Sequence, residues 1–118
     1  MIVAVALPPV PTAISTSVSA RVAGDPLRVE QPHLTSVGWT PPATAAGAPL
    51  VAVLDTGVAG DAPDLQAVLD TRYARSFAPG SRDALVDVEG HGTHVAGIIA
   101  ATSDNAVGVS GVSAARIL

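Results

Sequence analysis

Two histidines that lie three residues apart are the first candidates for chemistry. The stretch EGHGTHVAGIIAA at 89–101 places His91 and His94 among glycines, directly before an apolar run. Two imidazoles on one helix face can share a metal ion, as in zinc sites. However, only His33 could add a third imidazole, the chain has no cysteine, and no glutamate separates the pair. Metal ligation and a plain polar helix start therefore remain alternatives to a catalytic role.

A catalytic role for His91 requires a carboxylate as a partner. An imidazole works as a general base when a carboxylate holds its Nδ1–H and stabilises the imidazolium that forms. The apolar run LVAVL at 50–54 ends abruptly in Asp55, and Gly57 comes soon after it. Such a run is typical of a strand covered on both faces in a parallel sheet, and functional groups collect at the carboxyl ends of such strands. We therefore predict that Asp55 orients His91.

The histidines should stand at the start of a helix. Val95, Ile98, Ile99 and Thr102 follow the i, i+3, i+4, i+7 spacing of a helix that packs on a core with this face. The polar segment 79–89 before it is predicted to be an exposed loop. Three other segments are predicted as strands and one as a short helix or turn, in chain order an edge strand at 27–30, the helix or turn at 61–71, and strands at 73–77 and 116–118.

The composition excludes several classes of function. The 118 residues carry a net charge of −4, with 14% charged residues and arginine as the only basic side chain, so nucleic acid is not an expected partner. Without cysteine there is no disulfide framework and no thiolate site. Three prolines interrupt the apolar first twenty residues, so no membrane span is expected, and a basic region typical of a secretion signal is missing.

Two motifs in this order resemble a known family. LVAVLDTGV at 50–58 and GHGTHVAG at 90–97 are similar to the aspartate and histidine signatures of the subtilisin-like (S8, subtilase) serine proteases. APDL at 62–65 and DNAVGVSGV at 104–112 extend the resemblance. It implies the chain order Asp, His, Ser, with Asp55 and His91 as catalytic residues. His94 would then be the second histidine of the motif, which is structural.

The resemblance also implies a fold and a division of the chain. The fold would be α/β, a subtilisin-like doubly wound parallel sheet of which only the N-terminal part is present. Residues 1–34 would be a leader or propeptide remnant, 35–49 a Pro/Ala/Gly-rich linker, and 50–118 the N-terminal part of the catalytic domain. DPLRVE at 25–30 weakly resembles the end of a propeptide. Peptide or protein substrates, a propeptide as partner, and secretion are the matching expectations.

A structural calcium site is implied in part. In the family, an aspartate after the catalytic one and the loop after the histidine helix supply hard oxygen ligands, which calcium prefers. The matching positions here are the side chains of Asp64 and Asn105 and the carbonyls of Thr102, Val107 and Val109. The alternative is that Asp64 caps a helix and Asn105 makes a turn.

The sequence departs from the family in ways that bear on activity. Ala59 and Ala62 replace a frequent aspartate and histidine, which affects peripheral positions. No GTSxA nucleophile motif and no oxyanion asparagine segment occur, and we interpret Ser103, Ser110 and Ser113 as structural. Because the triad works as a unit, these 118 residues alone should not hydrolyse peptides. We therefore predict a serine endopeptidase by family that is inactive in this form, with a noncatalytic binding or assembly module as the alternative.

Overall fold

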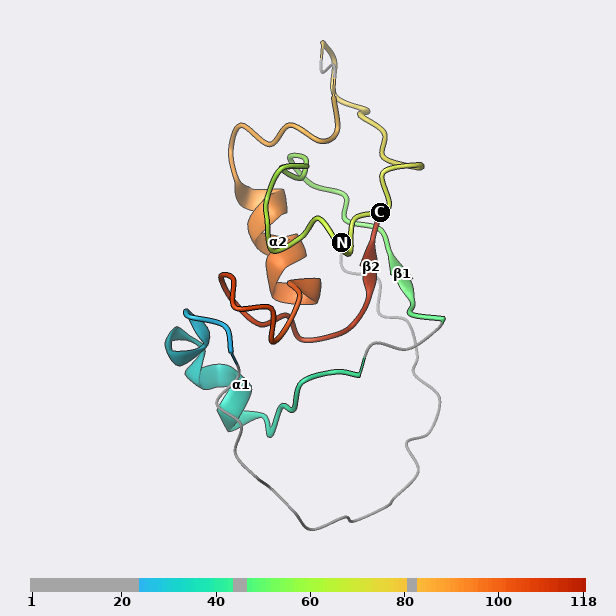
Figure 1. The fold of residues 1–118 in the computed structure, drawn as a ribbon. Coiled ribbons are helices and arrows are strands. Elements are labelled where there is room, and N and C mark those ends of the chain that lie inside the picture. The colour runs from blue at the N-terminus through green and yellow to red at the C-terminus, as the bar shows by residue number, and fades with distance from the viewer. Residues whose placement is uncertain (1–23, 44–46, 81–82) are drawn as a thin grey trace.

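The computed structural model describes residues 24–43, 47–80 and 83–118, and Figure 1 shows its fold. A short 3-10 helix and a short α-helix come first, then a strand, a longer helix and a second strand. In chain order these are η1 (Arg28–Glu30), α1 (Pro32–Ser36), β1 (Leu50–Val51), α2 (His91–Ala100) and β2 (Arg116–Ile117).

The two strands form a parallel pair with α2 packed beside it (Figure 1). Leu50 lies opposite Arg116, and the ladder continues past the strand ends, where the Val53 N–H donates to the Leu118 carbonyl at 3.1 Å. On its other edge β2 pairs with Leu69, again in parallel. The strands predicted at 50–54 and 116–118 are thus present in part and adjacent, but Leu50 and Leu54 are 45% and 88% exposed, so the first run is not covered on both faces as predicted. The prediction of an α/β fold with a parallel sheet is confirmed.

Helix α2 begins where the sequence predicts, but a different face is buried. Its buried residues are Gly92, Ala96 and Ala100, whereas Ile98 is 46% exposed. Ala96 and Ala100 belong to a core cluster with Val58, Leu65, Ala115 and Ile117. The predicted face is therefore only partly correct: Ile99 packs against this cluster, but the fully buried positions are small residues, because the helix lies close to its neighbours there.

Two of the predicted strands are absent from the part of the chain that the structure describes. Residues 27–30 form η1, where the N–H groups of Arg28 and Gln31 donate to carbonyls three residues back, so that the preceding turn continues as a 3-10 helix. Residues 73–77 form no ladder, and Phe77 is 90% exposed. The edge of β2 that a further strand could have used is taken by Leu69 instead.

An ion-pair cluster fixes the chain after Leu69. The nearly buried carboxylate of Asp70 accepts two hydrogen bonds from the Arg72 guanidinium, at 2.8 and 2.7 Å, and also contacts Arg116 of β2. The hydrogen bonds from Arg72, together with the positive charge of both arginines, lower the pKa of Asp70 to about 2. Asp70 thereby holds the turn at 71–73 against the sheet.

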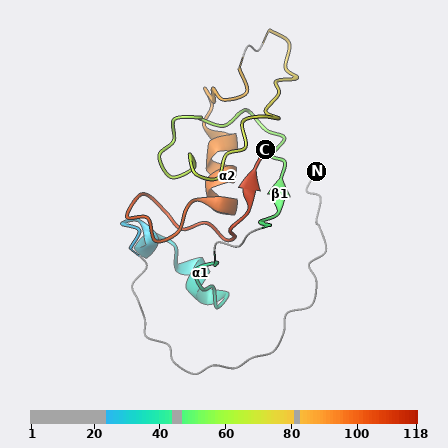
Figure 2. The same ribbon diagram turned by 45° about the vertical axis from the view of Figure 1, so that its right-hand side comes forward.

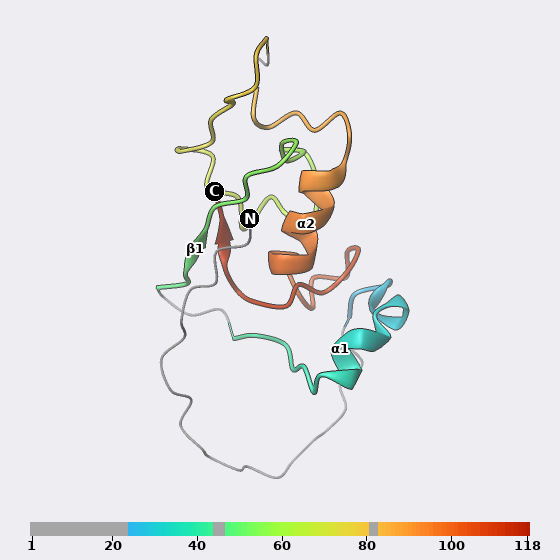
Figure 3. The same ribbon diagram turned by 180° about the vertical axis from the view of Figure 1, so that it is seen from behind.

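Residues 25–39, which include the start of the predicted linker, lie against the loop that comes after α2, as Figures 2 and 3 show from two sides. The side-chain amide of Gln31 makes two 2.9 Å hydrogen bonds with the backbone of Ser110, and the Trp39 indole donates to the Val112 carbonyl at 3.2 Å. Asp25 is buried there and accepts a 2.6 Å hydrogen bond from the Ser110 hydroxyl. This contact joins residues about eighty positions apart.

The proposed division of the chain is only partly visible. Residues 1–23 of the predicted leader and 44–46 of the predicted linker lie outside the described residues. Helix α1 crosses the boundary placed between residues 34 and 35, and its Leu34 is buried. Within the described ranges, no helix is long and apolar enough to cross a membrane.

Candidate active site

The structure brings the two predicted catalytic residues together. Asp55 lies just past the end of the β1 ladder and His91 is the first residue of α2, and the Nδ1 atom of His91 lies 2.7 Å from Oδ1 of Asp55. The same carboxylate oxygen accepts the N–H of Thr56 at 2.8 Å. With Nδ1–H donated to Asp55, the ring has Nε2 left to take a proton, as a general base requires.

The electrostatics of the pair arise from this contact. The hydrogen bond from His91 is the main cause that lowers the pKa of Asp55. The same hydrogen bond, together with the negative charge of Asp55, raises the pKa of His91. The negative charges of Asp87 and Glu89 raise the pKa of His91 further. The His91 side chain is 67% exposed and that of Asp55 17%. The carboxylate is thus held largely inside, while the imidazole reaches solvent.

We expect His91 to titrate above its ordinary pKa of 6.5. A raised folded-state pKa means that the pair stabilises the fold fully below about pH 6.5, and that this stabilisation is lost as the pH rises through the folded-state value. Since the imidazole is mostly exposed, solvent screens the effect on stability. An NMR titration of the His91 ring should show a midpoint above 6.5 that falls in Asp55→Asn. Equal midpoints in the two proteins would contradict the pairing.

A third carboxylate, that of Asp87 in the segment predicted as an exposed loop, lies at the start of α2. Its Oδ1 accepts hydrogen bonds from the Gly90 N–H at 2.9 Å and the Thr56 hydroxyl at 2.8 Å. Its Oδ2 accepts the N–H and the hydroxyl of Thr93, at 2.8 and 2.6 Å. These bonds, above all the one from the Thr93 hydroxyl, hold the pKa of Asp87 far below its usual range. The sequence offered one indication of this role: Asp87 is an acidic residue just ahead of a helix start, where free N–H groups favour a carboxylate.

The glycines around His91 have separate tasks. Gly90 is in the left-handed region with φ 79°, which turns the chain into the helix. Gly92 allows close contact, since a Cβ there would lie 2.1 Å from the carbonyl oxygen of Gly57. By contrast, a Cβ at Gly97 would meet no atom of another segment within 4 Å.

The predicted calcium ligands are partly brought together. Asp64 accepts hydrogen bonds from the Asn105 side-chain nitrogen at 2.8 Å and from the Val109 N–H at 2.9 Å. The Asn105 oxygen accepts the Val107 N–H at 2.7 Å, which closes a turn. The Thr102 N–H donates to the Asp64 carbonyl at 3.0 Å. The segments that carry the predicted ligands thus meet, but through N–H groups, and the carbonyls of Thr102, Val107 and Val109 take no part in these contacts.

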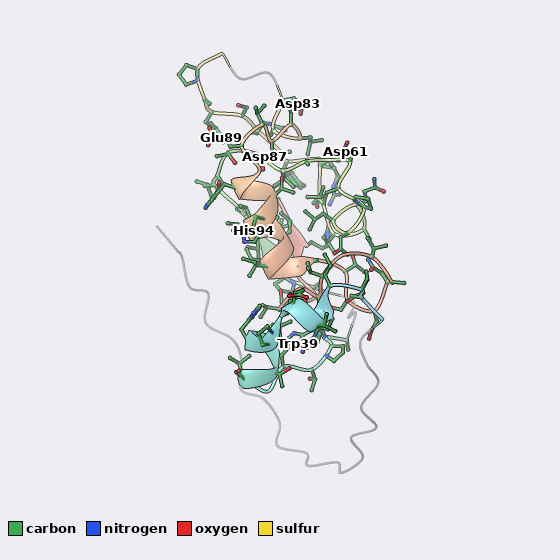
Figure 4. All side chains as sticks on the ribbon, turned by 90° about the vertical axis from the view of Figure 1, so that its left-hand side faces the viewer. Trp39, Asp61, Asp83, Asp87, Glu89 and His94 are labelled. Carbon is green, nitrogen blue, oxygen red and sulfur yellow. The ribbon has the colours of Figure 1, made fainter. Side chains whose placement is uncertain are left out.

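The remaining candidates lie away from the pair. Figure 4 shows Asp87 and Glu89 at the N-terminal end of α2, His94 on its flank, and Trp39 near α1. The Ser110 hydroxyl is fully buried against Asp25, and that of Ser113 donates to the Ile99 carbonyl at 2.9 Å. Both serines therefore have structural contacts, as expected. The Ser103 hydroxyl is buried as well.

An apolar hollow of about 520 Å³ borders Asp55. It lies at the carboxyl ends of the paired strands, and its lining includes Leu54, Val58, Leu69 and Phe77. Leu54 is 88% exposed. In parallel α/β sheets this edge is where ligands and catalytic groups are found. Asp55 thus stands beside a mainly apolar surface.

Comparison with known proteins places the chain. The sequence profile of the Subtilase family matches residues 47–118, more than half of the chain. The cell wall-associated protease of Bacillus subtilis (strain 168) is 46% identical over 65 residues, which are 55% of this chain and 7% of that protein. Halolysin of Haloferax mediterranei is 42% identical over 71 residues, or 58% of this chain and 14% of halolysin.

A longer match is found in a subtilisin of Bacillus pumilus. It is 37% identical over 91 residues, which are 77% of this chain and 30% of that subtilisin. A match of this length must begin at Arg28 or earlier, so the similarity includes the segment that packs on the loop after α2. The chain thus spans less than a third of the length of each of these three relatives. No solved structure matches it. The motifs, the Asp–His pair and the family profile agree, and the chain belongs to the subtilase family.

Proposed function

We propose that this chain is the Asp–His part of a serine endopeptidase that hydrolyses peptide bonds through an Asp–His–Ser triad. The observation that carries the proposal is the 2.7 Å contact between His91 Nδ1 and Asp55 Oδ1. His91 would take the proton of a serine outside these 118 residues while Asp55 holds its tautomer, and water would later release the acyl group. Because no GTSxA segment is present, the chain as it stands has no nucleophile to activate.

The second candidate is a noncatalytic binding or assembly module derived from a subtilase. The two candidates differ in the coding sequence downstream of the codon for Leu118. An open frame that reaches a GTSxA serine supports the protease, and an immediate stop codon supports the module.

A direct assay complements the sequencing. The purified 118-residue chain should neither cleave a chromogenic peptide substrate nor react with a serine-directed phosphonate. A product of the extended frame should do both, and mutation of its GTSxA serine should abolish both. Cleavage by the short chain would contradict the assignment of its serines as structural.

The partners and location depend on the same proposal. Peptide or protein substrates, a propeptide and secretion are expected of a protease of this kind. The relatives themselves include a cell wall-associated protease and an intracellular serine protease of Paenibacillus polymyxa. Cell fractionation of the source organism, with antibodies to the chain, would decide between export and retention.

We also propose that the loop after α2 binds calcium as a structural ion. Asp64 and Asn105 would hold it together with the carbonyls of Thr102, Val107 and Val109, all of them hard oxygen ligands. In support, the side chains of Asp64 and Asn105 are in contact, although binding would require the Asn105 amide to turn and to give up the Val107 N–H that its oxygen accepts. The ion would supply positive charge beside the Asp64 carboxylate and fix the loop.

Calcium is therefore expected to stabilise the chain against heat. Binding at a hundred times the dissociation constant adds about 2.7 kcal/mol, which should raise the thermal midpoint by several degrees. Asp64→Asn should remove the calcium-dependent shift, and Asp61→Asn, a change at an exposed carboxylate nearby, should keep it. Identical midpoints with calcium and with a chelator would contradict the proposal.

A further inference from the structure

We propose that Asp87 is a positioning residue for the Asp55–His91 pair, because its carboxylate locks the two threonine hydroxyls that join α2 to the turn after Asp55. The inference rests on the proposed function and deepens it. The hydrogen bonds of Asp87 reach neither Asp55 nor His91, so apart from its charge, which raises the pKa of His91, any effect on the pair must pass through its neighbours.

The cross-links have a reciprocal form. The Thr56 hydroxyl, next to Asp55, donates to Asp87 and accepts the N–H of Gly92 in the helix at 3.0 Å. The Thr93 hydroxyl, in the helix, donates to Asp87 and accepts the N–H of Ala59 in the turn at 2.9 Å. Each threonine thus reaches from its own segment to a backbone amide of the other segment.

The direction of these bonds depends on Asp87. A hydroxyl has one proton, and an ionised carboxylate can only accept. Both threonines must therefore donate to Asp87, which leaves their oxygen lone pairs for the crossing amides. The hydrogen bonds also hold the pKa of Asp87 far below its usual range, so that the group stays ionised at any working pH.

The catalytic residues are the immediate neighbours of these links. Thr56 is the residue after Asp55 and donates its own N–H to the Asp55 carboxylate at 2.8 Å. His91 lies between Gly90, whose N–H binds Asp87, and Gly92, whose N–H binds Thr56. A change in the cross-links would therefore shift both ends of the 2.7 Å contact.

Asp87→Asn removes both the negative charge and one hydrogen-bond acceptor, and comparison with a second variant separates the two effects. An asparagine keeps the shape but offers one acceptor oxygen and one donor nitrogen, so one threonine hydroxyl loses its acceptor and can turn away from its crossing amide. Glu89→Gln is the matched control. Glu89 also raises the pKa of His91 by its charge, so this variant removes a comparable charge and leaves the four hydrogen bonds of Asp87 in place.

The primary readout is the His91 Nδ1 proton in NMR spectra of the 118-residue chain. In the wild type and in Glu89→Gln we expect a far-downfield proton that exchanges slowly, as a proton held by Asp55 should. In Asp87→Asn we expect it to broaden or disappear while the helical circular dichroism is kept. In a product of the extended frame, Asp87→Asn should lower kcat by about 10- to 100-fold with KM changed by less than about twofold, since small misplacements of a catalytic group have effects of this size.

Other results would overturn either the positioning role of Asp87 or the protease proposal, and the two cases can be told apart. A downfield proton that persists in Asp87→Asn, with kcat unchanged, overturns the positioning role and leaves the protease proposal intact. A wild-type chain whose His91 shows no bond to Asp55 overturns the protease proposal itself. If the Asp87→Asn variant does not fold, Thr56→Val provides the test of the positioning role. It deletes one cross-link and leaves three hydrogen-bond donors on Asp87. Retention of the downfield His91 proton in Thr56→Val would overturn the positioning role.

Discussion

Asp55→Asn should lower kcat by about 10⁴-fold in a product of the extended frame, with substrate binding unchanged. The neutral amide cannot stabilise the imidazolium that forms when His91 takes the serine proton, and it also permits the tautomer in which Nε2 carries a hydrogen and cannot accept one. At about 1.36 kcal/mol for each factor of ten, the loss is about 5.4 kcal/mol of transition-state stabilisation. Steady-state kinetics on a peptide substrate measures it.

The expected size of the fall in kcat depends on how firmly the Asp55 carboxylate is held in its hydrogen bond with His91. Its Oδ1 accepts both the His91 Nδ1–H and the Thr56 N–H, and its side chain is only 17% exposed. Water therefore cannot easily replace the carboxylate. Asp61→Asn, at an exposed carboxylate in the next turn, is the matched control and should keep wild-type turnover. Turnover of Asp55→Asn within tenfold of the wild type would contradict the role of Asp55.

The pairing of Asp55 with His91 was predictable because each residue stands at the end of a strongly patterned element and because the resemblance to the subtilase motifs selected this pairing among the alternatives. A continuous apolar run ends at Asp55, and a glycine-flanked apolar helix begins at His91. Such elements pack in few ways, so their ends meet at one edge of the sheet. The strand at 116–118 was predictable for the same reason, since its apolar residues pair beside β1.

The burial of α2 was not predictable from apolar spacing. The spacing rule selects large side chains, yet of the residues it selects Ile98 is exposed, and the fully buried positions of the helix are Gly92, Ala96 and Ala100. Which face is buried depends on how close the neighbouring chain lies, and here the carbonyl of Gly57 lies against Gly92. That distance is a property of the tertiary structure, which a single sequence does not contain.

The role of Asp87 was missed for a similar reason. In a polar loop, one carboxylate among several looks like part of a solvated surface, and Asp83 and Glu89 are indeed exposed. What distinguishes Asp87 is its set of partners, Thr56 and Thr93, which lie 31 residues before it and 6 residues after it. Only the packing of α2 against the turn after Asp55 brings both hydroxyls to one carboxylate.

Gly92→Ala should destabilise the fold and separate the catalytic pair, while the same change at Gly97 should not. At Gly92 the added Cβ would lie 2.1 Å from the Gly57 carbonyl oxygen and 3.1 Å from Cβ of Asp55, so the helix must move away from the turn. Overpacking of this kind costs about 1–3 kcal/mol, a large part of the stability of a small domain. Urea unfolding should show a lower midpoint, and His91 should titrate closer to 6.5.

Gly97→Ala is the control that separates steric contact from helix propensity. Alanine is favoured over glycine inside a helix by about 1 kcal/mol, and a Cβ at Gly97 would meet nothing within 4 Å. This variant should therefore be as stable as the wild type or more stable, with the His91 titration unchanged. If Gly→Ala lowers the stability at position 92 but not at position 97, the difference is explained by contact between α2 and the turn after Asp55 at Gly92. Equal effects of the two variants would show that the start of α2 does not approach the carbonyl of Gly57. Such a result would also contradict the 2.7 Å contact between Asp55 and His91, because that contact depends on the same approach.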